Sequence, residues 1–365
     1  MYAFEPSDEQ QMLIEAVGRF AQMDLRPAAH QAEEERLLPS KLIGKGWELG
    51  VLQASVPEAY GGFGQRSCVT GVLALEELAF GDAAGALTVA GPGLFALPIL
   101  LAGSESQKKE FLPGIIAGAW KPFTAALIEY RFDFDPNDLQ TTAARKDGAY
   151  VLRGEKAFVP YAPDAAGMIV YASLEGITQG FILPRGTAGL DVSDEREHLM
   201  GFNALPLYRV TLTEATIPAD NRLGGLGGHD FAPILASMRV ANAAAAVGLA
   251  RAAFEYSRDY AKEREAFGVK IAQKQAIAFM LAEMATEIEA MRLLTWEAAW
   301  KIDSAEPDAG EAAYLAATGA ADMALMVADR AVQILAGHGY IREHPVELWM
   351  RNARGFAMLT GLAIV

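Results

Sequence analysis

The stretch from Asp230 to Arg264 constrains the fold of this chain more than any other. Its apolar residues recur at three- and four-residue spacing, as on one face of an α-helix. At about 1.5 Å per residue, such a helix would be on the order of 50 Å long. Helices this long and this rich in alanine usually pack in bundles, often across a subunit boundary. We therefore expect a long-helix bundle in the C-terminal part of the chain.

The N-terminal third also has a helical pattern, which runs from Ser7 to about Gly118. Ser7 with Gln10, and Ser104 with Gln107, have the spacing of capping boxes. In a capping box, two side chains satisfy backbone donors that are left free at a helix start. We therefore expect an all-helical block in which helices begin after Ser7 and Ser104.

The middle of the chain has the texture of β-strands. Between residues 120 and 213, short runs of β-branched and aromatic residues are broken by turn signals such as Asp147-Gly148. A glycine-rich link, residues 224–228, then leads into the C-terminal helices. The predicted fold is therefore α+β and mainly α, with an N-terminal helical domain (1–119), a middle antiparallel β domain (120–225) and a C-terminal bundle of four long helices (226–365).

The charge balance excludes one class of partner. The chain has 31 Lys and Arg residues against 46 Asp and Glu residues, a formal net charge of −15. Such a chain repels the phosphates of nucleic acids and the anionic surface of a membrane. We therefore expect no nucleic-acid partner.

Cysteine usage and hydrophobic patterning favour a cytoplasmic protein. Cys68 is the single cysteine, so it can form neither an intramolecular disulfide nor a thiolate zinc site. The N-terminus is acidic from Glu5 onward, unlike a secretory signal. The uncharged stretch 83–104 contains Pro92 and Pro98, which would break a spanning helix. We therefore expect no membrane insertion.

Metal binding is not predicted. The histidines show no metal-ligand spacing. Asp133, Asp135 and Asn137 have the spacing of a calcium loop, but Asp138 stands where the loop needs glycine and Ala144 where it needs glutamate.

Two segments of the predicted bundle have residue types that suit a nucleotide. The first runs from Arg264 through Phe267 to Gln275, and the second from Gln333 through Gly337. An arginine fork can bind a pyrophosphate, glycine lets backbone N–H groups approach it, and phenylalanine with glutamine can flank an adenosine. Singly, each segment is more often an ordinary helix end. Together, after a helix-sheet-helix order, they shift the balance toward binding of a pyrophosphate and an adenosine.

The sequence resembles the acyl-CoA dehydrogenase family over nearly its whole length. Two further motifs support the resemblance, residues 57–64 (PEAYGGFG) and 75–84 (LEELAFGDAA). The resemblance implies helical ends around a β domain, a tetramer, and FAD bound at a subunit interface. It also implies that a carboxylate removes the α proton of an acyl-CoA thioester while the β hydrogen leaves as hydride to the flavin. Electron-transfer flavoprotein is the implied electron acceptor.

The catalytic base of the family is missing from both places where the resemblance locates it. Most members have glutamate directly before a glycine, and here Thr360 stands before Gly361. The second known location is the residue before an arginine, and here Met238 stands before Arg239. A threonine hydroxyl cannot act as a base of carboxylate strength near neutral pH. Arg239 matches an arginine of the family and is an expected substrate-site residue. We therefore predict no catalytic residue in this chain.

The segments that would seat the flavin also depart from the family pattern. Family hydroxyl residues correspond here to Ile128, Phe134 and Pro160, and two family glycines to Arg131 and Asp133. Large side chains fill volume, and lost hydroxyls remove hydrogen-bond donors. We therefore expect the flavin pocket of this chain to be blocked.

The losses are selective. The residues that a family member offers to the FAD of its neighbour are intact: Arg264, Phe267, Gln275, Gln333 and Gly337. This asymmetry resembles the non-catalytic subunit of heteromeric (α2β2) acyl-CoA dehydrogenases, some of which act on CoA thioesters of steroid side chains. The expected context is degradation of fatty acids or of steroid side chains. The asymmetry implies a homologous partner subunit that carries the catalytic glutamate. Two alternatives stay open, a divergent homotetramer with a non-standard base and a flavin-free scaffold or regulator.

Overall fold

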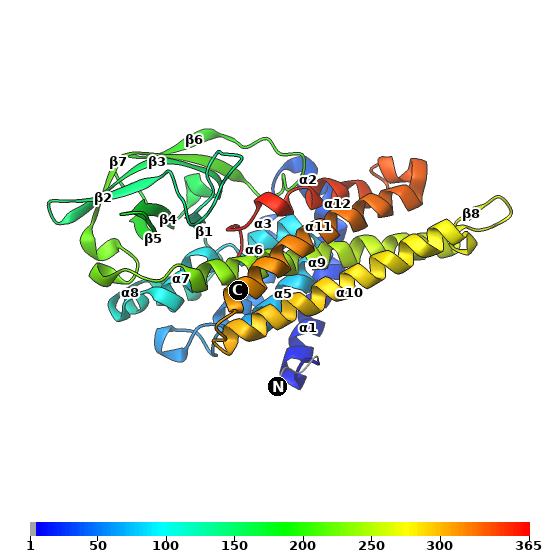
Figure 1. Ribbon diagram of the computed structural model, residues 1–365, viewed down its shortest axis with the longest axis horizontal. Coiled ribbons are helices and arrows are strands. Elements are labelled where there is room, and N and C mark those ends of the chain that lie inside the picture. Colours follow the sequence, from blue (N-terminus) through cyan, green and yellow to red (C-terminus); the bar gives the residue numbers. More distant parts are fainter. Residues whose placement is uncertain (1–4) are drawn as a thin grey trace.

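The computed structural model describes residues 5–365. The molecule is elongated, with a β-sheet at one end and a helical bundle that extends to the other (Figure 1). Both predicted capping boxes are present, at Ser7 and Ser104. The N-terminal part is helical, as predicted: α1 (Asp8–Phe20), α2 (Arg26–Glu35), α3 (Ser40–Glu48), α4 (Val51–Ala54), α5 (Cys68–Gly81), α6 (Ala83–Ala90), α7 (Gly93–Ala102) and α8 (Glu105–Ile116).

The middle part is a seven-stranded sheet in the order β1-β4-β2-β3-β7-β6, with β5 paired to β4. It differs from the expected antiparallel sheet because β1 and β2 run parallel to β4. Short strand runs carry no signal of direction, so the sequence did not indicate these two pairings. The strands are β1 (Phe123–Ala126), β2 (Thr142–Lys146), β3 (Ala149–Pro160), β4 (Gly167–Leu174), β5 (Ile177–Pro184), β6 (Leu190–Arg196) and β7 (Leu207–Pro218).

The C-terminal part contains the predicted long helix, α9 (Ala232–Glu263). The expected bundle of four long helices has three, because the fourth helix, α12 (Val346–Ala353), has 8 residues. The remaining elements are the hairpin β8 (Glu265–Ala266) and β9 (Val269–Lys270), α10 (Gln275–Asp303), α11 (Ala309–Leu335), the short 3-10 helix η7 (Ala336–Tyr340) and α12 (Val346–Ala353).

Helix α5 of the N-terminal part packs closely on α9. A Cβ atom at Gly248 would lie 2.2 Å from the carbonyl oxygen of Glu76, so only glycine permits this approach. Arg251 of α9 donates at 2.6 Å to both Glu76 and Glu77 of α5. Arg292 of α10 pairs with Glu76 at 2.9 Å. This buried charge cluster joins the N-terminal helices to the bundle.

The long apolar helices are core elements. Within residues 5–365, α9 alone is long and apolar enough to cross a membrane as a single helix, but 83% of its most apolar window is buried inside the protein. The uncharged stretch 83–104 forms α6 and α7, which are bent by 50° relative to each other. Both stretches are therefore explained by packing.

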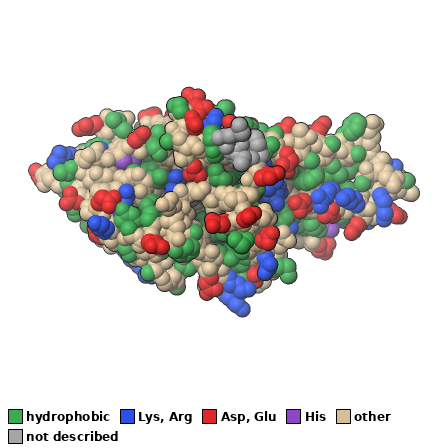
Figure 2. Space-filling model, turned by 90° about the horizontal axis from the view of Figure 1, so that it is seen from below, with side chains coloured by type: hydrophobic (Ala, Val, Ile, Leu, Met, Phe, Trp, Pro, Cys, Tyr) green, Lys and Arg blue, Asp and Glu red, His purple; other side chains and the backbone are tan. Residues whose placement is uncertain are grey.

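The surface mixes charges of both signs. On the face shown in Figure 2, acidic and basic side chains are interspersed, and hydrophobic side chains lie between them. Lys and Arg side chains are more frequent toward the end where the bundle carries the β8–β9 hairpin (Figures 1 and 2).

Candidate functional site

The five residues expected to contact a nucleotide lie on three neighbouring segments at one end of the bundle. This end is the one farthest from the sheet (Figure 1). All five are exposed, and we call them the bundle-end cluster: Arg264 after α9, Phe267 at the tip of the β8–β9 hairpin, Gln275 at the start of α10, Gln333 in α11 and Gly337 in η7.

The hairpin presents an aromatic ring to solvent. Phe267 and Gly268 have φ angles of 56° and 79°, which suit a two-residue turn between paired strands. The Phe267 side chain is 95% exposed, and Lys274 Nζ lies 5.8 Å from its ring centroid. A planar apolar ring held open in this way can stack on an adenine.

The polar members of the bundle-end cluster are free to bind a ligand. Within residues 5–365, the side chains of Arg264, Gln275 and Gln333 make no hydrogen bond or ion pair. A Cβ atom at Gly337 would meet no atom within 4 Å, so its backbone is open to approach. Free guanidinium and amide donors beside open backbone and an exposed ring fit the ADP half of FAD. The elements that carry the cluster lie at the end of the bundle farthest from the sheet of this chain (Figure 1).

A second candidate site is a cleft of about 290 Å³ at the junction of the bundle and the middle part. Thr360 and Arg239 both line this cleft, whereas Met238 is fully buried and does not. The other lining residues are Phe134, Pro136, Asn242, Tyr314, Ala317, Thr318, Ala321, Asp322, Phe356, Ala357 and Met358.

Arg239 is a half-buried cation without an ion-pair partner among residues 5–365. Burial lowers the pKa of Arg239, and the nearby Tyr314 and Asp135 oppose this shift. Its guanidinium lies 5.0 Å from the centroid of the Tyr314 ring. Such a guanidinium can bind an anionic or carbonyl group that enters the cleft.

Among the residues of this cleft that the sequence did not indicate, three are polar residues of α11. Tyr314, Thr318 and Asp322 lie on one face of α11 at four-residue spacing, a polar stripe on an otherwise alanine-rich helix. That spacing was a signal that could have located them. Asp322 is the single carboxylate among the residues that line the cleft. Asn242 donates to the carbonyl oxygen of Phe356 at 2.9 Å and so holds the segment that leads to Thr360.

The substitutions in the flavin-seating segments do not all act as expected. Ile128 (4% exposed) and Pro160 are buried in the protein, and Phe134 lines the cleft. Arg131, in contrast, donates to the carbonyl oxygen of Asp133 in its own loop, and Asp133 itself is exposed. The expectation that Asp133 fills the pocket is therefore not supported, because its side chain is 89% exposed. The Arg131 side chain is only 16% exposed, but it binds within its own loop.

A buried ion pair anchors this loop to the sheet. Glu129 accepts hydrogen bonds from the backbone N–H groups of Gln140 and Thr141 at 2.8 Å, and its carboxylate pairs with Lys156 of β3. Burial lowers the pKa of Lys156 to about 8, although Glu129 favours its charged form. The two ends of the loop are thereby fixed.

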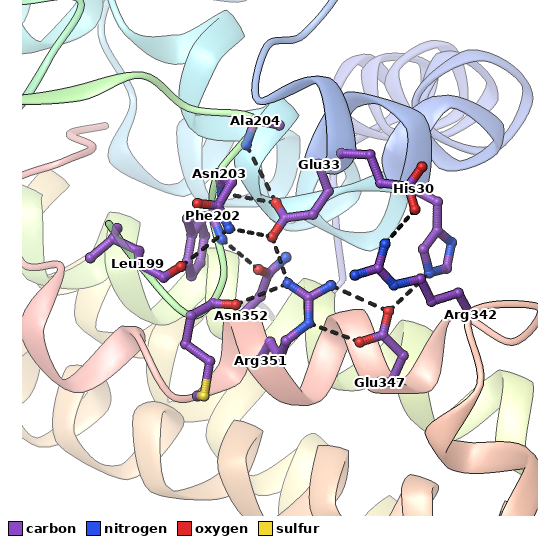
Figure 3. A network of polar contacts seen from close by, with 12 residues as sticks. His30, Glu33, Leu199, Phe202, Asn203, Ala204, Arg342, Glu347, Arg351 and Asn352 are labelled. Carbon is purple, nitrogen blue, oxygen red and sulfur yellow. Dashed lines mark hydrogen bonds and ion pairs between the residues drawn. The ribbon is translucent and has the colours of Figure 1, made fainter. Parts of the chain in front are cut away.

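A polar network ties α2 and α12 together (Figure 3). Arg351 donates to Glu33 at 2.6 Å and to Glu347 at 2.8 Å, and His30 lies 3.3 Å from Glu347. Glu33 also accepts from the backbone N–H of Asn203 at 2.8 Å. Burial alone would raise the pKa of Glu347, but the hydrogen bonds from His30 and Arg351 outweigh it and lower the pKa to about 2.

Residues 5–365 contain no candidate metal-binding site. No group of three or more His, Cys, Asp or Glu residues in that range is arranged to hold a metal ion.

Comparison with known proteins identifies the family. Three family models match the chain in order: the acyl-CoA dehydrogenase N-terminal domain (residues 7–119), middle domain (126–215) and C-terminal domain (228–363). An acyl-CoA dehydrogenase of Bacillus subtilis (strain 168) is 35% identical over 357 residues, which are 95% of this chain and 93% of that protein.

Solved structures agree. Butyryl-CoA dehydrogenase from Megasphaera elsdenii has a TM-score of 0.89 and 33% sequence identity, over 99% of this chain and 96% of that one. A structure described as the electron transferring flavoprotein of Acidaminococcus fermentans gives the same TM-score, identity and coverage. FAD is the cofactor that goes with these matches, and the bundle-end cluster fits its ADP half. The chain therefore belongs to the acyl-CoA dehydrogenase family of FAD-dependent oxidoreductases.

Proposed function

We propose that this chain is a non-catalytic subunit of a heteromeric acyl-CoA dehydrogenase. In this role it clamps the ADP half of an FAD whose flavin reacts in a homologous partner chain. The observation that supports the proposal is an asymmetry. The bundle-end cluster is exposed and complete, whereas the two base positions hold Thr360, which lines the cleft, and Met238, which is buried.

The chemistry of the family explains why the base decides the role. The α proton of a thioester is only weakly acidic, so its removal needs a positioned carboxylate close to the α carbon. When bound, FAD supplies the acceptor for the β hydride. Neither Thr360 nor Met238 can take the proton, so under this proposal the partner chain carries the glutamate.

The lining of the cleft supports the same assignment. Phe134 lines the cleft together with Thr360 and Arg239, so an isoalloxazine and an acyl-CoA thioester would have to share the cleft with its ring. Under the proposal, the flavin and the thioester stack in the partner chain, and the bundle-end cluster binds the other half of FAD.

In the proposed complex, the residues of this chain bind and orient FAD. Arg264 binds the pyrophosphate with its guanidinium, and the open backbone at Gly337 approaches the same group. Phe267 stacks on the adenine, and Gln275 and Gln333 donate hydrogen bonds to the nucleotide. We infer that these contacts fix the flavin in the partner and exclude water from the interface.

A relative of known substrate supports the substrate class. The Megasphaera relative is a butyryl-CoA dehydrogenase, which supports an acyl-CoA thioester as substrate. We propose a fatty acyl or steroid side-chain group, electron-transfer flavoprotein as acceptor and a cytoplasmic location. We also propose that the three parts of the chain, 1–119, 120–225 and 226–365, act as its domains.

A second candidate function is a divergent homotetramer with a non-standard base. Asp322 favours it, because this carboxylate lines the same cleft as Thr360 and Arg239. A flavin-free scaffold is the third candidate, and the free donors of the bundle-end cluster argue against it.

The visible spectrum of the chain distinguishes the three candidates. The chain is purified alone and after co-expression with a homologue that carries the catalytic glutamate, and FAD is counted per chain. The partner-subunit function requires little FAD alone and one FAD per pair of different chains in the complex. One FAD per chain in the isolated protein would instead establish the homotetramer. Absence of flavin from both preparations would leave the scaffold.

A further inference from the structure

Tyr260, in the last turn of α9, contacts Arg264 of the bundle-end cluster and the turn that carries Gly337. Its carbonyl oxygen accepts a hydrogen bond from the backbone N–H of Arg264 at 2.8 Å. Its hydroxyl lies 2.7 Å from Nδ1 of His338, the residue that follows Gly337. One residue thus connects the arginine of the cluster to the turn that carries the glycine.

The turn that carries Gly337 has a strained backbone. Ala336, where α11 passes into η7, has φ 51° and ψ −126°, a region that residues other than glycine rarely adopt. Such conformations persist only where surrounding contacts over-determine them. Within residues 5–365, the contact between His338 and Tyr260 is the only side-chain hydrogen bond that joins η7 to another element. This contact is therefore the polar anchor of the turn.

A second contact between a tyrosine and a histidine lies next to this one, but it does not involve η7. The hydroxyl of Tyr256, one turn earlier on α9, lies 2.7 Å from Nδ1 of His344. The rings of His338 and His344 are stacked, with centroids 5.3 Å apart and an interplanar angle of 13°. His344 lies beyond η7, and the Tyr256 contact touches no member of the bundle-end cluster. Each tyrosine hydroxyl therefore makes the same kind of contact with a histidine, but only the Tyr260 contact reaches η7.

We propose that Tyr260 and His338 are positioning residues for FAD. Their contact sets the spacing between the Arg264 guanidinium and the backbone at Gly337, which bind the pyrophosphate from two sides. The inference rests on the proposed function, in which the bundle-end cluster holds the ADP half of FAD. Without the Tyr260 hydroxyl, η7 relaxes from its strained conformation, and FAD binding must then order the turn again at a cost in affinity.

Matched variants of the full-length chain test the proposal in the assembly in which it binds FAD. The dissociation constant of FAD is measured by equilibrium dialysis, and thermal unfolding is followed in parallel. Tyr260→Phe removes one hydrogen bond, so we expect FAD affinity to fall between about twofold and tenfold. Tyr256→Phe removes the equivalent hydroxyl and should leave FAD affinity unchanged. His338→Asn keeps a polar atom near the Nδ1 position and should retain affinity that His338→Leu loses.

The outcomes separate this inference from the proposed function. If Arg264→Ala leaves FAD affinity unchanged, the cluster does not hold FAD, and both proposals fail. If Arg264→Ala weakens FAD while Tyr260→Phe does not, only the positioning role fails. Equal losses in Tyr260→Phe and Tyr256→Phe would also overturn it, because general destabilisation would then explain both. Faster amide hydrogen exchange of residues 336–340 in Tyr260→Phe alone supports the anchored turn.

Discussion

Lys156 Nζ lies 2.8 Å from Glu129 Oε1, and the two side chains are 0% and 5% exposed. The pair joins β3 to the loop that follows β1. A buried pair of opposite charges is well tolerated as a unit, because each charge compensates the desolvation of the other. Removing one member alone leaves an uncompensated charge inside the protein.

We therefore expect Glu129→Gln to lower the free energy of unfolding by about 3 to 5 kcal/mol. Urea unfolding of the variant measures the loss. The double variant Glu129→Gln/Lys156→Met removes both charges and should recover a large part of it. A double variant less stable than the single one would show that the charges are not compensating each other.

Asp82 gives stability an unusual pH dependence. This residue caps α6 by accepting from the backbone N–H of Gly85 at 2.7 Å, and burial raises its pKa to about 6 from an ordinary 3.8. Between these values the folded state holds the proton more tightly than the unfolded state, so stability falls as pH rises. Asn keeps the cap and cannot titrate. We expect Asp82→Asn to gain up to about 3 kcal/mol relative to the parent between pH 4 and pH 6. Parallel stability curves for the two proteins would contradict the raised pKa.

Glu347 should behave in the opposite sense. Its pKa is about 2 in the folded protein and 4.5 ordinarily, so its stabilising effect is complete above pH 4.5 and disappears as pH falls toward 2. The advantage of the parent over Glu347→Gln should therefore shrink by up to about 3 kcal/mol across this window. Denaturant unfolding at several acidic pH values measures it. A constant difference would mean that His30 and Arg351 do not hold the charged form.

Arg264→Ala tests the clamp directly. The loss of a charge-assisted contact of roughly 1.5 to 3 kcal/mol should weaken FAD retention about tenfold to a hundredfold. Equilibrium dialysis of the flavin-containing complex gives the affinity. Arg258→Ala is the matched control, because Arg258 lies near the end of α9, just before Arg264, but already pairs with Asp259 at 2.8 Å. If the Arg264→Ala variant binds FAD as well as the control, Arg264 only solvates a helix end.

Thr360→Glu restores the family residue, yet we expect no activity from it. A base acts only when flavin and thioester are stacked within reach, and the cleft holds Phe134 instead. A carboxylate there without its substrate is costly or stays protonated. The measurement is acyl-CoA-dependent bleaching of flavin, scored per FAD, against a partner whose own glutamate has been removed. Recovered bleaching would show that the cleft admits flavin after all.

The sequence predicted the elements better than their contacts. The periodicity of the α9 stretch and the capping boxes at Ser7 and Ser104 are local signals, and the structure confirms them. The parallel pairings of β4 could not be predicted, because strand direction depends on partners far apart in the chain. Likewise, Arg131 was expected to fill a pocket, but it binds a carbonyl oxygen two residues away.

The two candidate sites also differ in how far the sequence could predict them. The bundle-end cluster was predictable because its residues lie in two short motifs that match a family. Asp322 and Asn242 were missed because each joins the cleft only through the packing of α9 against α11. The contact between Tyr260 and His338 could not be predicted from the sequence either, because the two residues are 78 positions apart.

The hairpin that exposes Phe267 points away from the sheet of its own chain (Figure 1). Under the proposed function, cofactor loading is then a matter of mass action between chains as well as between protein and FAD. A site enclosed within one chain fills to the same fraction at any protein concentration, whereas a site divided between two chains empties on dilution even in excess FAD. Scarcity of either chain would thus release flavin from protein that is still folded.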